Sequence, residues 1–321
     1  MALSIKDIIT PQYVKDTVAL GVDLTLDDGT PFPDVVFEAA IDHAIAMVEA
    51  EAGIVIDPRT FTEERHDADI QERYAFYPIH LDNLPLRTVD KLAIKIGTTN
   101  AATLPVEWVT INSHLTAKFN IIPTSTTVGS VYFRSGIPLL VGDVFSPYSR
   151  FPSYFAVDYT AGFTFEEGSF TFPAGEQKFT LPLIEKYLGG RPIVSFTIDG
   201  VSTSSIRVIT SGATSLKLYV SEPFAANTFV EYSCHDVDPL VLKSVAILAS
   251  FLPLDVAGDL IAGAGIAAKS ISLDALSQSI NTTSSATNAG YSARVKQFQT
   301  ELKAAMHALK SKYARINFWA R

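Results

Sequence analysis

An acidic stretch early in this 321-residue sequence holds side chains that could bind a cation. Its members are Glu63, Glu64, His66, Asp67, Asp69 and Glu72. Carboxylate oxygens are the ligands that hard divalent cations prefer. The stretch lacks the Asx-Gly spacing of a calcium loop, however, and a run of charges is also typical of a solvated turn. We therefore interpret it as a solvated turn, with a cation site as the alternative.

A second group, Cys234, His235 and Asp236, places a nucleophile type beside a base type. Adjacent residues of a strand point to opposite faces of a sheet, so the thiol and the imidazole are not expected to meet. Cys234 is also the only cysteine of the chain, which excludes an internal disulfide and a metal cage of several cysteines.

Known catalytic and phosphate-binding motifs are missing from the sequence. It contains no dinucleotide fingerprint, no phosphate-binding loop with its lysine, no zinc-protease helix and no nucleophile elbow. Aromatic residues in the strand-like regions could form a sugar-binding platform or pack in a core. Examples are Phe145, Tyr148, Phe151, Tyr154 and Phe155. We expect no cofactor, no metal site and no enzymatic activity.

The composition limits the classes of protein to which the chain can belong. Apolar residues make up 47% of it and charged residues 18%, so it is not a disordered chain. Its net charge of −9 argues against general nucleic-acid binding. A low fraction of charged residues leaves surface for contacts with other proteins.

Helical periodicity marks both ends of the chain. Residues 34–52 predict a helix, in which Phe37, Ile41 and Val48 lie on one face and Gly53 ends the last turn. The stretch after Asp238 is apolar almost all round, as in a buried helix. Pro253 is expected to stop that helix, so that residues 245–268 form a buried helical hairpin.

The last predicted helix covers residues 291–316 and carries one apolar stripe. The stripe comprises Tyr291, Val295, Phe298, Leu302, Met306, Leu309 and Tyr313. Residues 288–321 carry a net charge of +6, against −15 for the rest of the chain. This contrast favours docking onto an acidic partner, although a surface helix that covers the core has the same pattern.

Between the helices the period changes to two, which is the period of strands. Six short runs within residues 61–162 predict an antiparallel sheet. Further alternating runs in 163–235 suit a small β-sandwich of immunoglobulin-like size, in which Asp199-Gly200 predicts a hairpin turn. The expected fold class is α+β. A helical core of about four helices, formed by 1–162 and 236–321, contains a β region at 60–162 and carries 163–235 as an inserted β-sandwich domain.

Several segments together resemble the head–tail connector (neck adaptor) proteins of tailed bacteriophages. They are EAAIDHAIAMVEAEAG (38–53), FAVDYTAGF (155–163), LVLKSVAILASF (240–251) and the run from Ser272 to Leu309. The most specific piece runs from Ser277 to Arg294. In that family a V-x-Y-x-A-G strand end leads almost directly into the apolar helix. The resemblance therefore implies that 163–235 is an insertion.

The resemblance implies a structural virion protein and not an enzyme. Such connectors form a homo-oligomeric ring beneath the portal, usually of twelve copies. They bridge the portal protein to a further neck or tail protein, and they line the channel through which genomic DNA passes without specific binding. No membrane is involved. The implied location is the neck of the virion, between capsid and tail, after assembly in the host cytoplasm.

The resemblance also implies which residues contact partners, because the C-terminal helix and tail of such connectors engage the portal. The interface residues expected here, toward portal or neighbouring copy, are Tyr291, Arg294, Phe298, Lys312, Arg315, Phe318, Trp319 and Arg321. The alternative function is a β-rich module that binds carbohydrate or another surface through 163–235.

Overall fold

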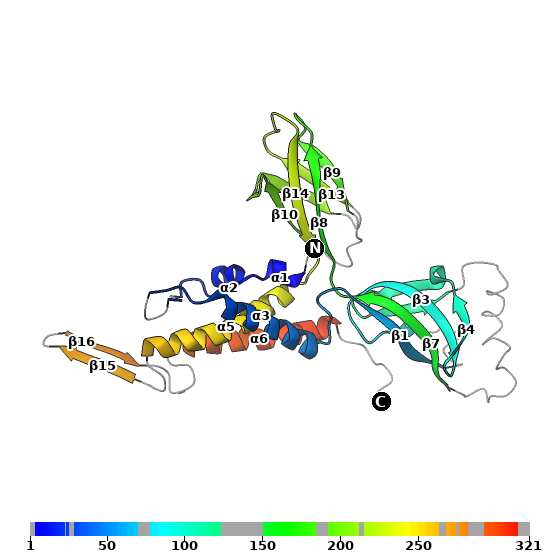
Figure 1. Cartoon of the computed structure of the whole chain (residues 1–321), viewed down its shortest axis with the longest axis horizontal. Helices are drawn as coiled ribbons and strands as arrows, with labels where there is room; N and C mark the ends of the chain where they lie inside the picture. The colour runs from blue at the N-terminus through cyan, green and yellow to red at the C-terminus, as the bar shows by residue number, and fades with distance from the viewer. Residues whose placement is uncertain are drawn as a thin grey trace. The chain divides into compact units, whose positions relative to one another are not determined.

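A computed structural model gives the structure of the chain (Figure 1). It describes residues 4–22, 24–25, 29–69, 78–122, 150–183, 192–211, 215–262, 268–273, 276–281 and 292–313. The chain divides into two compact units. A β unit is built around residues 54–236, and a helical unit is formed by residues 3–53 together with 237–312.

Five α-helices of the helical unit are described. They are α1 (Ile5–Ile8), α2 (Pro11–Thr17), α3 (Asp34–Ala52), α5 (Pro239–Ala262) and α6 (Ser292–Tyr313). Local signals fix their starts, since Ser4 and Asp7 form a capping box on α1 and the Thr10 hydroxyl accepts the Tyr13 amide in α2. A two-stranded hairpin, β15 (Ala268–Leu273) with β16 (Leu276–Asn281), follows α5 in a polar stretch for which no element was predicted.

Helix α3 has the predicted bounds. Gly53 ends it in the left-handed conformation, at φ 66°, where a residue without a Cβ carries no steric penalty. Its predicted face is buried, with Phe37 and Val48 inaccessible to solvent and Ile41 nearly so. This face packs against α5, which explains why a moderately apolar helix is stable here.

Helix α5 corrects one prediction, because it runs without interruption through Pro253. The predicted helical hairpin at 245–268 is therefore wrong. A proline inside a helix removes a hydrogen bond and costs about 3 kcal/mol locally. Burial continues beyond it at Leu254 and Ala257, so apolar packing outweighs that local cost. Among the described helices only α5 is long and apolar enough to cross a membrane, and most of that stretch is buried inside the protein.

The first part of the β unit contains two antiparallel sheets. One has the order β1-β7-β3-β4, with β1 (Arg59–Asp69), β3 (Leu86–Ile96), β4 (Thr99–Leu104) and β7 (Arg150–Ala161). The other has the order β2-β6-β5, with β2 (Ile79–His80), β5 (Val109–Ser113) and β6 (Lys118–Ile121). A short 3₁₀ turn, η2 (Val106–Trp108), precedes β5. This region has large buried side chains of its own, among them Trp108, Phe119 and Tyr159.

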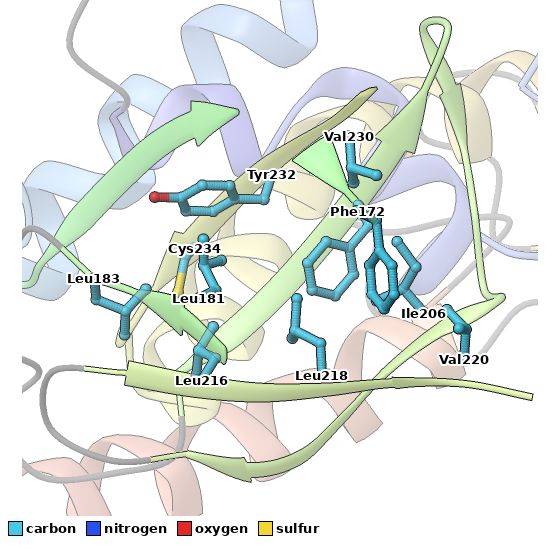
Figure 2. Close-up of a cluster of buried hydrophobic side chains, with 11 residues drawn as sticks. Phe172, Leu181, Leu183, Ile206, Leu216, Leu218, Val220, Val230, Tyr232 and Cys234 are labelled. Atoms are coloured by element: carbon cyan, nitrogen blue, oxygen red, sulfur yellow. The ribbon is translucent and has the colours of Figure 1, made fainter. Parts of the chain in front are cut away.

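The second part is the β-sandwich, here defined as strands β8 to β14. One sheet has the order β11-β10-β14-β8 and the other β12-β13-β9. Their bounds are β8 (Phe165–Phe172), β9 (Lys178–Pro182), β10 (Ile193–Ile198), β11 (Val201–Ser202), β12 (Ile206–Ser211), β13 (Ser215–Val220) and β14 (Thr228–His235). Between the sheets lies a core that includes Phe172, Leu218 and Val230 (Figure 2). Asp199 and Gly200 both have positive φ, 52° and 76°, and make the predicted hairpin turn between β10 and β11.

The predicted fold class is wrong. Among the described residues strands hold more of the chain than helices, so the protein is mainly β and not a helical core with a single insertion. The β region at 60–162 buries its own apolar residues and joins the sandwich in the β unit. Alternation predicted several of these strands but not β1, which was interpreted as a solvated turn, and periodicity gives no information on which unit the strands join. The proposed independence of 163–235 stays a prediction.

Candidate interaction face of the last helix

The predicted apolar stripe of α6 is buried wherever the structure describes it, with one exception. Val295, Phe298, Met306, Leu309 and Tyr313 are buried, whereas Leu302 is half-buried. Tyr291 lies outside the described residues. The stripe therefore packs inside the protein, and the basic residues of α6 lie on its other faces. A partner would meet those basic faces and, of the stripe, only the part at Leu302 and Met306 that lines a groove.

Arg294, a predicted interface residue, is bonded within the helical unit. Its guanidinium donates to the carbonyl oxygens of Val18 at 2.6 Å and Leu20 at 3.1 Å, just past the end of α2. It also lies over the ring of Phe298, 5.4 Å from the centroid. Carbonyl groups at a helix end have no intrahelical partner and favour a cation. Arg294 therefore fixes α6 to α2.

Lys312, a second predicted interface residue, also has an internal partner. Its ammonium lies 2.6 Å from Asp238 Oδ2, and the Asp238 side chain is only 5% exposed. The other oxygen of Asp238 accepts the Leu240 amide at 2.8 Å at the start of α5. One carboxylate thus caps α5 and holds the end of α6. Lys312 therefore has a structural role, as the ion-pair partner of Asp238 within the helical unit.

Two further ion pairs join α6 to the neighbouring helices. Lys310 lies 2.9 Å from Glu51 of α3, and Lys243 of α5 lies 2.8 Å from Glu301. The hydrogen bonds from Lys243 and then from Gln297 hold the pKa of Glu301 below its usual range. Arg294, Lys310 and Lys312 of α6 thus each have a partner inside the helical unit.

A groove of about 480 Å³ remains along α6 beside the end of α3. Leu302 and Met306 are its apolar lining residues. The polar lining residues are Glu51, Gln299, Lys303, His307 and Lys310. No hydrogen bond or ion pair joins the side chains of Lys303 and His307 to another described residue. Such a groove suits an apolar side chain from a segment that also carries carboxylates.

The other predicted interface residues cannot be placed. Arg315, Phe318, Trp319 and Arg321 lie outside the described residues, and their role at an interface stays a prediction.

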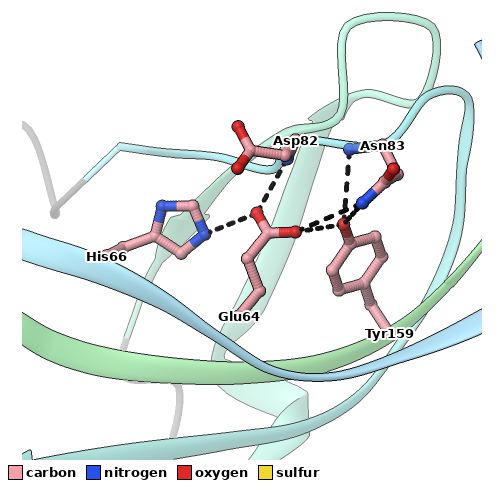
Figure 3. Close-up of polar contacts among 5 residues, drawn as sticks. All are labelled: Glu64, His66, Asp82, Asn83 and Tyr159. Carbon is pink, nitrogen blue, oxygen red and sulfur yellow. Dashed lines mark hydrogen bonds and ion pairs between the residues drawn. The ribbon is translucent and has the colours of Figure 1, made fainter. Parts of the chain in front are cut away.

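The acidic stretch lies on strand β1 as far as Asp69, so this part of it is not a solvated turn. Figure 3 shows the Glu64 carboxylate inside a network of polar groups. It accepts the Asp82 amide at 2.7 Å, His66 Nε2 at 2.9 Å and the hydroxyl of Tyr159. Burial raises the pKa of the Glu64 carboxyl, but the hydrogen bonds from His66, Tyr159 and Asp82 together outweigh burial and leave that pKa below its usual value.

Tyr159 of β7 is the residue on which this network depends. Its hydroxyl accepts the side-chain amide of Asn83 at 2.7 Å and donates to Glu64. Burial, followed by the hydrogen bond to Glu64, raises the pKa of Tyr159, so the phenol stays protonated and continues to donate. The network fixes the Asp82–Asn83 turn to the sheet. No sequence pattern indicated this, since Tyr159 and Glu64 are 95 positions apart.

Of the other acidic residues, Glu63 and Asp67 are also bonded, and the side chain of Asp69 is not described. Glu63 pairs with the buried ammonium of Lys95, and Asp67 accepts the Ser153 amide at 2.8 Å. Glu72 lies outside the described residues. Within the described part of the chain, no three His, Cys, Asp or Glu side chains are grouped to hold a metal ion.

The structure separates Cys234 from His235, as strand alternation predicts. Cys234 is buried in the core of the β-sandwich (Figure 2). His235 points to the other face and stacks on Phe165, with ring centroids 6.3 Å apart. Burial lowers the pKa of His235 to about 4, so its imidazole is neutral at pH 7. Asp236 accepts a backbone amide and does not orient the histidine.

The alternative of a sugar platform is not supported by the aromatic side chains that can be placed, which pack in a core. Tyr154 and Phe155 are buried and pack edge to face, with ring centroids 5.0 Å apart. Phe145 and Tyr148 lie outside the described residues, and the side chain of Phe151 is not described.

Comparison of the chain with protein-family models and with curated proteins found no match. The proposal below therefore rests on the geometry of the two units and on the resemblance in sequence.

Proposed function

We propose that this chain is a structural virion protein, a head-to-tail connector of a tailed bacteriophage. In this proposal the subunits form a ring beneath the portal, bridge the portal to a neck or tail protein and surround the DNA channel. The role is mechanical and involves no catalysis.

The observation that carries the proposal is the position of the two ends of the inserted segment. Thr164 and Asp236 are hydrogen-bonded to each other, and Phe165 pairs with His235 where β8 begins and β14 ends. In the connector family that the sequence resembles, the strand before this point leads almost directly into the helix that follows it. An insertion is tolerated where its two ends lie close together. The structure thus supports 163–235 as an addition to a connector chain.

The surface of the helical unit also supports assembly. Large apolar side chains are exposed on its helices and turns. They are Leu20, Val35, Met47, Leu252 and Val256. Leu252 and Val256 are four residues apart on α5 and share one face. Exposed apolar side chains that share a face are typical of surfaces that other proteins cover.

The groove on α6 gives the proposal a definite contact. An acidic segment of the portal with an apolar anchor would place that anchor against Leu302 and Met306 and its carboxylates beside Lys303 and His307. The acidic remainder of the ring would leave passing DNA unbound, because phosphate and carboxylate repel each other.

Native mass measurement of the purified chain, alone and with the portal protein encoded in the same genome, tests the proposal. We expect a closed ring or a subunit that joins portal particles in a fixed ratio. A chain that stays monomeric, does not bind the portal and binds glycans through the β-sandwich would favour the binding-module alternative instead.

A further inference from the structure

The outer face of the β12-β13-β9 sheet is basic. Lys178, Arg207 and Lys217 are exposed and alternate with the core residues of their strands. Arg207 is paired with Tyr219, and Tyr219 with Lys178, so two of the cations lie in one row across the sheet. No hydrogen bond or ion pair joins these three cationic side chains to another described residue.

The outer face of the other sheet, β11-β10-β14-β8, is acidic and rich in hydroxyl groups. Glu167 and Glu231 are its exposed charged residues. Ser and Thr residues surround them in the paired positions of the neighbouring strands. These are Ser169, Thr171, Ser195, Thr197 and Ser233. Because the shared core separates the two sheets, the basic and acidic faces point in opposite directions.

Each face also exposes a large apolar side chain. Ile209, the extra residue of a β-bulge in β12, is 54% exposed beside the basic face, and Phe229 is 54% exposed on the acidic face. Glu176 and Glu222 lie outside the strands, before β9 and after β13, so the strand positions of the basic face carry no acid. The two faces of one domain are complementary in charge, and each offers an apolar contact.

We propose that the β-sandwich of one copy packs its β12-β13-β9 face on the β11-β10-β14-β8 face of the next copy. This inference rests on the proposed function, because a contact between two different faces repeats from copy to copy and closes when the copies are arranged in a ring. The occupant of each face is thus a second copy of this chain.

The size of the contact explains why it needs the ring. Strands lie about 4.8 Å apart and rise about 3.4 Å per residue, so a three-stranded face of this length presents about 270 Å². Two such faces fall short of the roughly 1,000 Å² that a stable interface buries. Within a ring the neighbouring sandwiches are held together at a high effective concentration, where a weak contact is occupied.

Charge reversal in the full chain tests the proposal. The first variant carries Lys178→Glu and Lys217→Glu, and the second carries Glu167→Lys and Glu231→Lys. Sedimentation velocity of the parent, over a series up to about 1 mM, should show association that weakens as salt rises from about 0.05 to 0.5 M. Each variant alone should associate at least about tenfold more weakly than the parent.

An equimolar mixture of the two variants should recover the association. Where the two variants alternate, each altered face meets the altered face of the other variant and each native face meets a native face, and every such pair is opposite in charge. Both variants keep a net negative charge, since the parent carries −9. Attraction between the net charges of the two variants therefore cannot produce the recovery. Recovery would also show that both variants are folded.

Several results would overturn the proposal. They are a parent that is monomeric at every concentration, variants that associate like the parent, and a mixture that does not recover. Binding of heparin by the parent, lost in the Lys178→Glu and Lys217→Glu variant without any self-association, would assign the basic face to polyanions instead. Portal binding by the same variants reports on the proposed function separately, because the portal contact is placed on α6.

Discussion

The backbone amide of Thr164 donates to Asp236 Oδ1 at 2.6 Å, and the amide of Asp236 donates back to the Thr164 carbonyl at 3.2 Å. These two residues stand 72 positions apart and close the base of the β-sandwich. The chain therefore enters and leaves this domain through adjacent points.

Removing the sandwich should leave the rest of the protein folded. In a variant that joins Gly162 to Asp238 through a short linker, we expect the helical signal in circular dichroism to persist with a cooperative melt. Asp238 is kept because it caps α5 and pairs with Lys312. Loss of the helical signal would mean that the sandwich is required for the fold of the remainder.

Gly162, which follows β7, should tolerate no side chain. Its φ is 125°, and a Cβ would lie 2.8 Å from the Cα of Pro58, which is backbone and cannot rotate away. We expect Gly162→Ala to lower stability by about 2–4 kcal/mol. Gly97→Ala is the matched control, since Gly97 also has positive φ but open space around it. Equal thermal midpoints for the two variants would contradict the crowding argument.

Two apolar residues of α6 should respond differently to truncation. Leu309 is fully buried, so Leu309→Ala should cost about 2–5 kcal/mol in chemical unfolding. Leu302 is half-buried in the groove, so Leu302→Ala should cost clearly less but should weaken portal binding. If Leu302→Ala destabilises as much as Leu309→Ala, the groove is part of the core.

Two lysines of α6 should separate stability from binding. Lys312→Met leaves the buried Asp238 carboxylate without its cation and should cost about 1–3 kcal/mol, discounted because Lys312 itself is 45% exposed. Lys303→Met removes an exposed charge from the groove and should leave the thermal midpoint unchanged while it weakens portal binding. The opposite pattern would place the portal contact at Lys312.

His235 should make the sandwich less stable in mild acid. Burial lowers its pKa to about 4, whereas an unfolded histidine titrates near 6.5. The unfolded chain therefore binds the extra proton first, and stability present above about pH 6.5 is lost as the pH falls toward 4. Urea unfolding of the parent between these pH values should show a loss of at most about 3 kcal/mol that His235→Leu lacks. If the free energy of unfolding changed with pH in the same way in parent and variant, the lowered pKa of His235 would be contradicted.

Local signals predicted the elements whose causes are local. The α3 helix was found to the residue, because periodicity and Gly53 act within a few positions. The strands of the sandwich followed from alternation. The path of α5 through Pro253 was missed, because burial of distant side chains decides it. The Glu64 network was missed for the same reason, since its partners come from β1, β7 and the turn before β3.

The internal bonds of Arg294 and Lys312 were beyond prediction as well. Composition identified α6 as basic, but it could not show that carbonyl groups at the end of α2 and the cap of α5 use these two cations. Internal hydrogen bonds and ion pairs separate the cations that are free to meet a partner from those that are not, and these bonds depend on tertiary packing.

The closed base of the sandwich has a mechanical consequence. Strand β8 begins and strand β14 ends side by side, so tension along the chain would pull the two strands apart from that end. Hydrogen bonds between antiparallel strands loaded in this way break one pair after another and not all together. The hydrogen bonds between Thr164 and Asp236 bear this tension first. While they stay intact, the force is transmitted from residue 163 to residue 237 and the strands of the sandwich are not stretched.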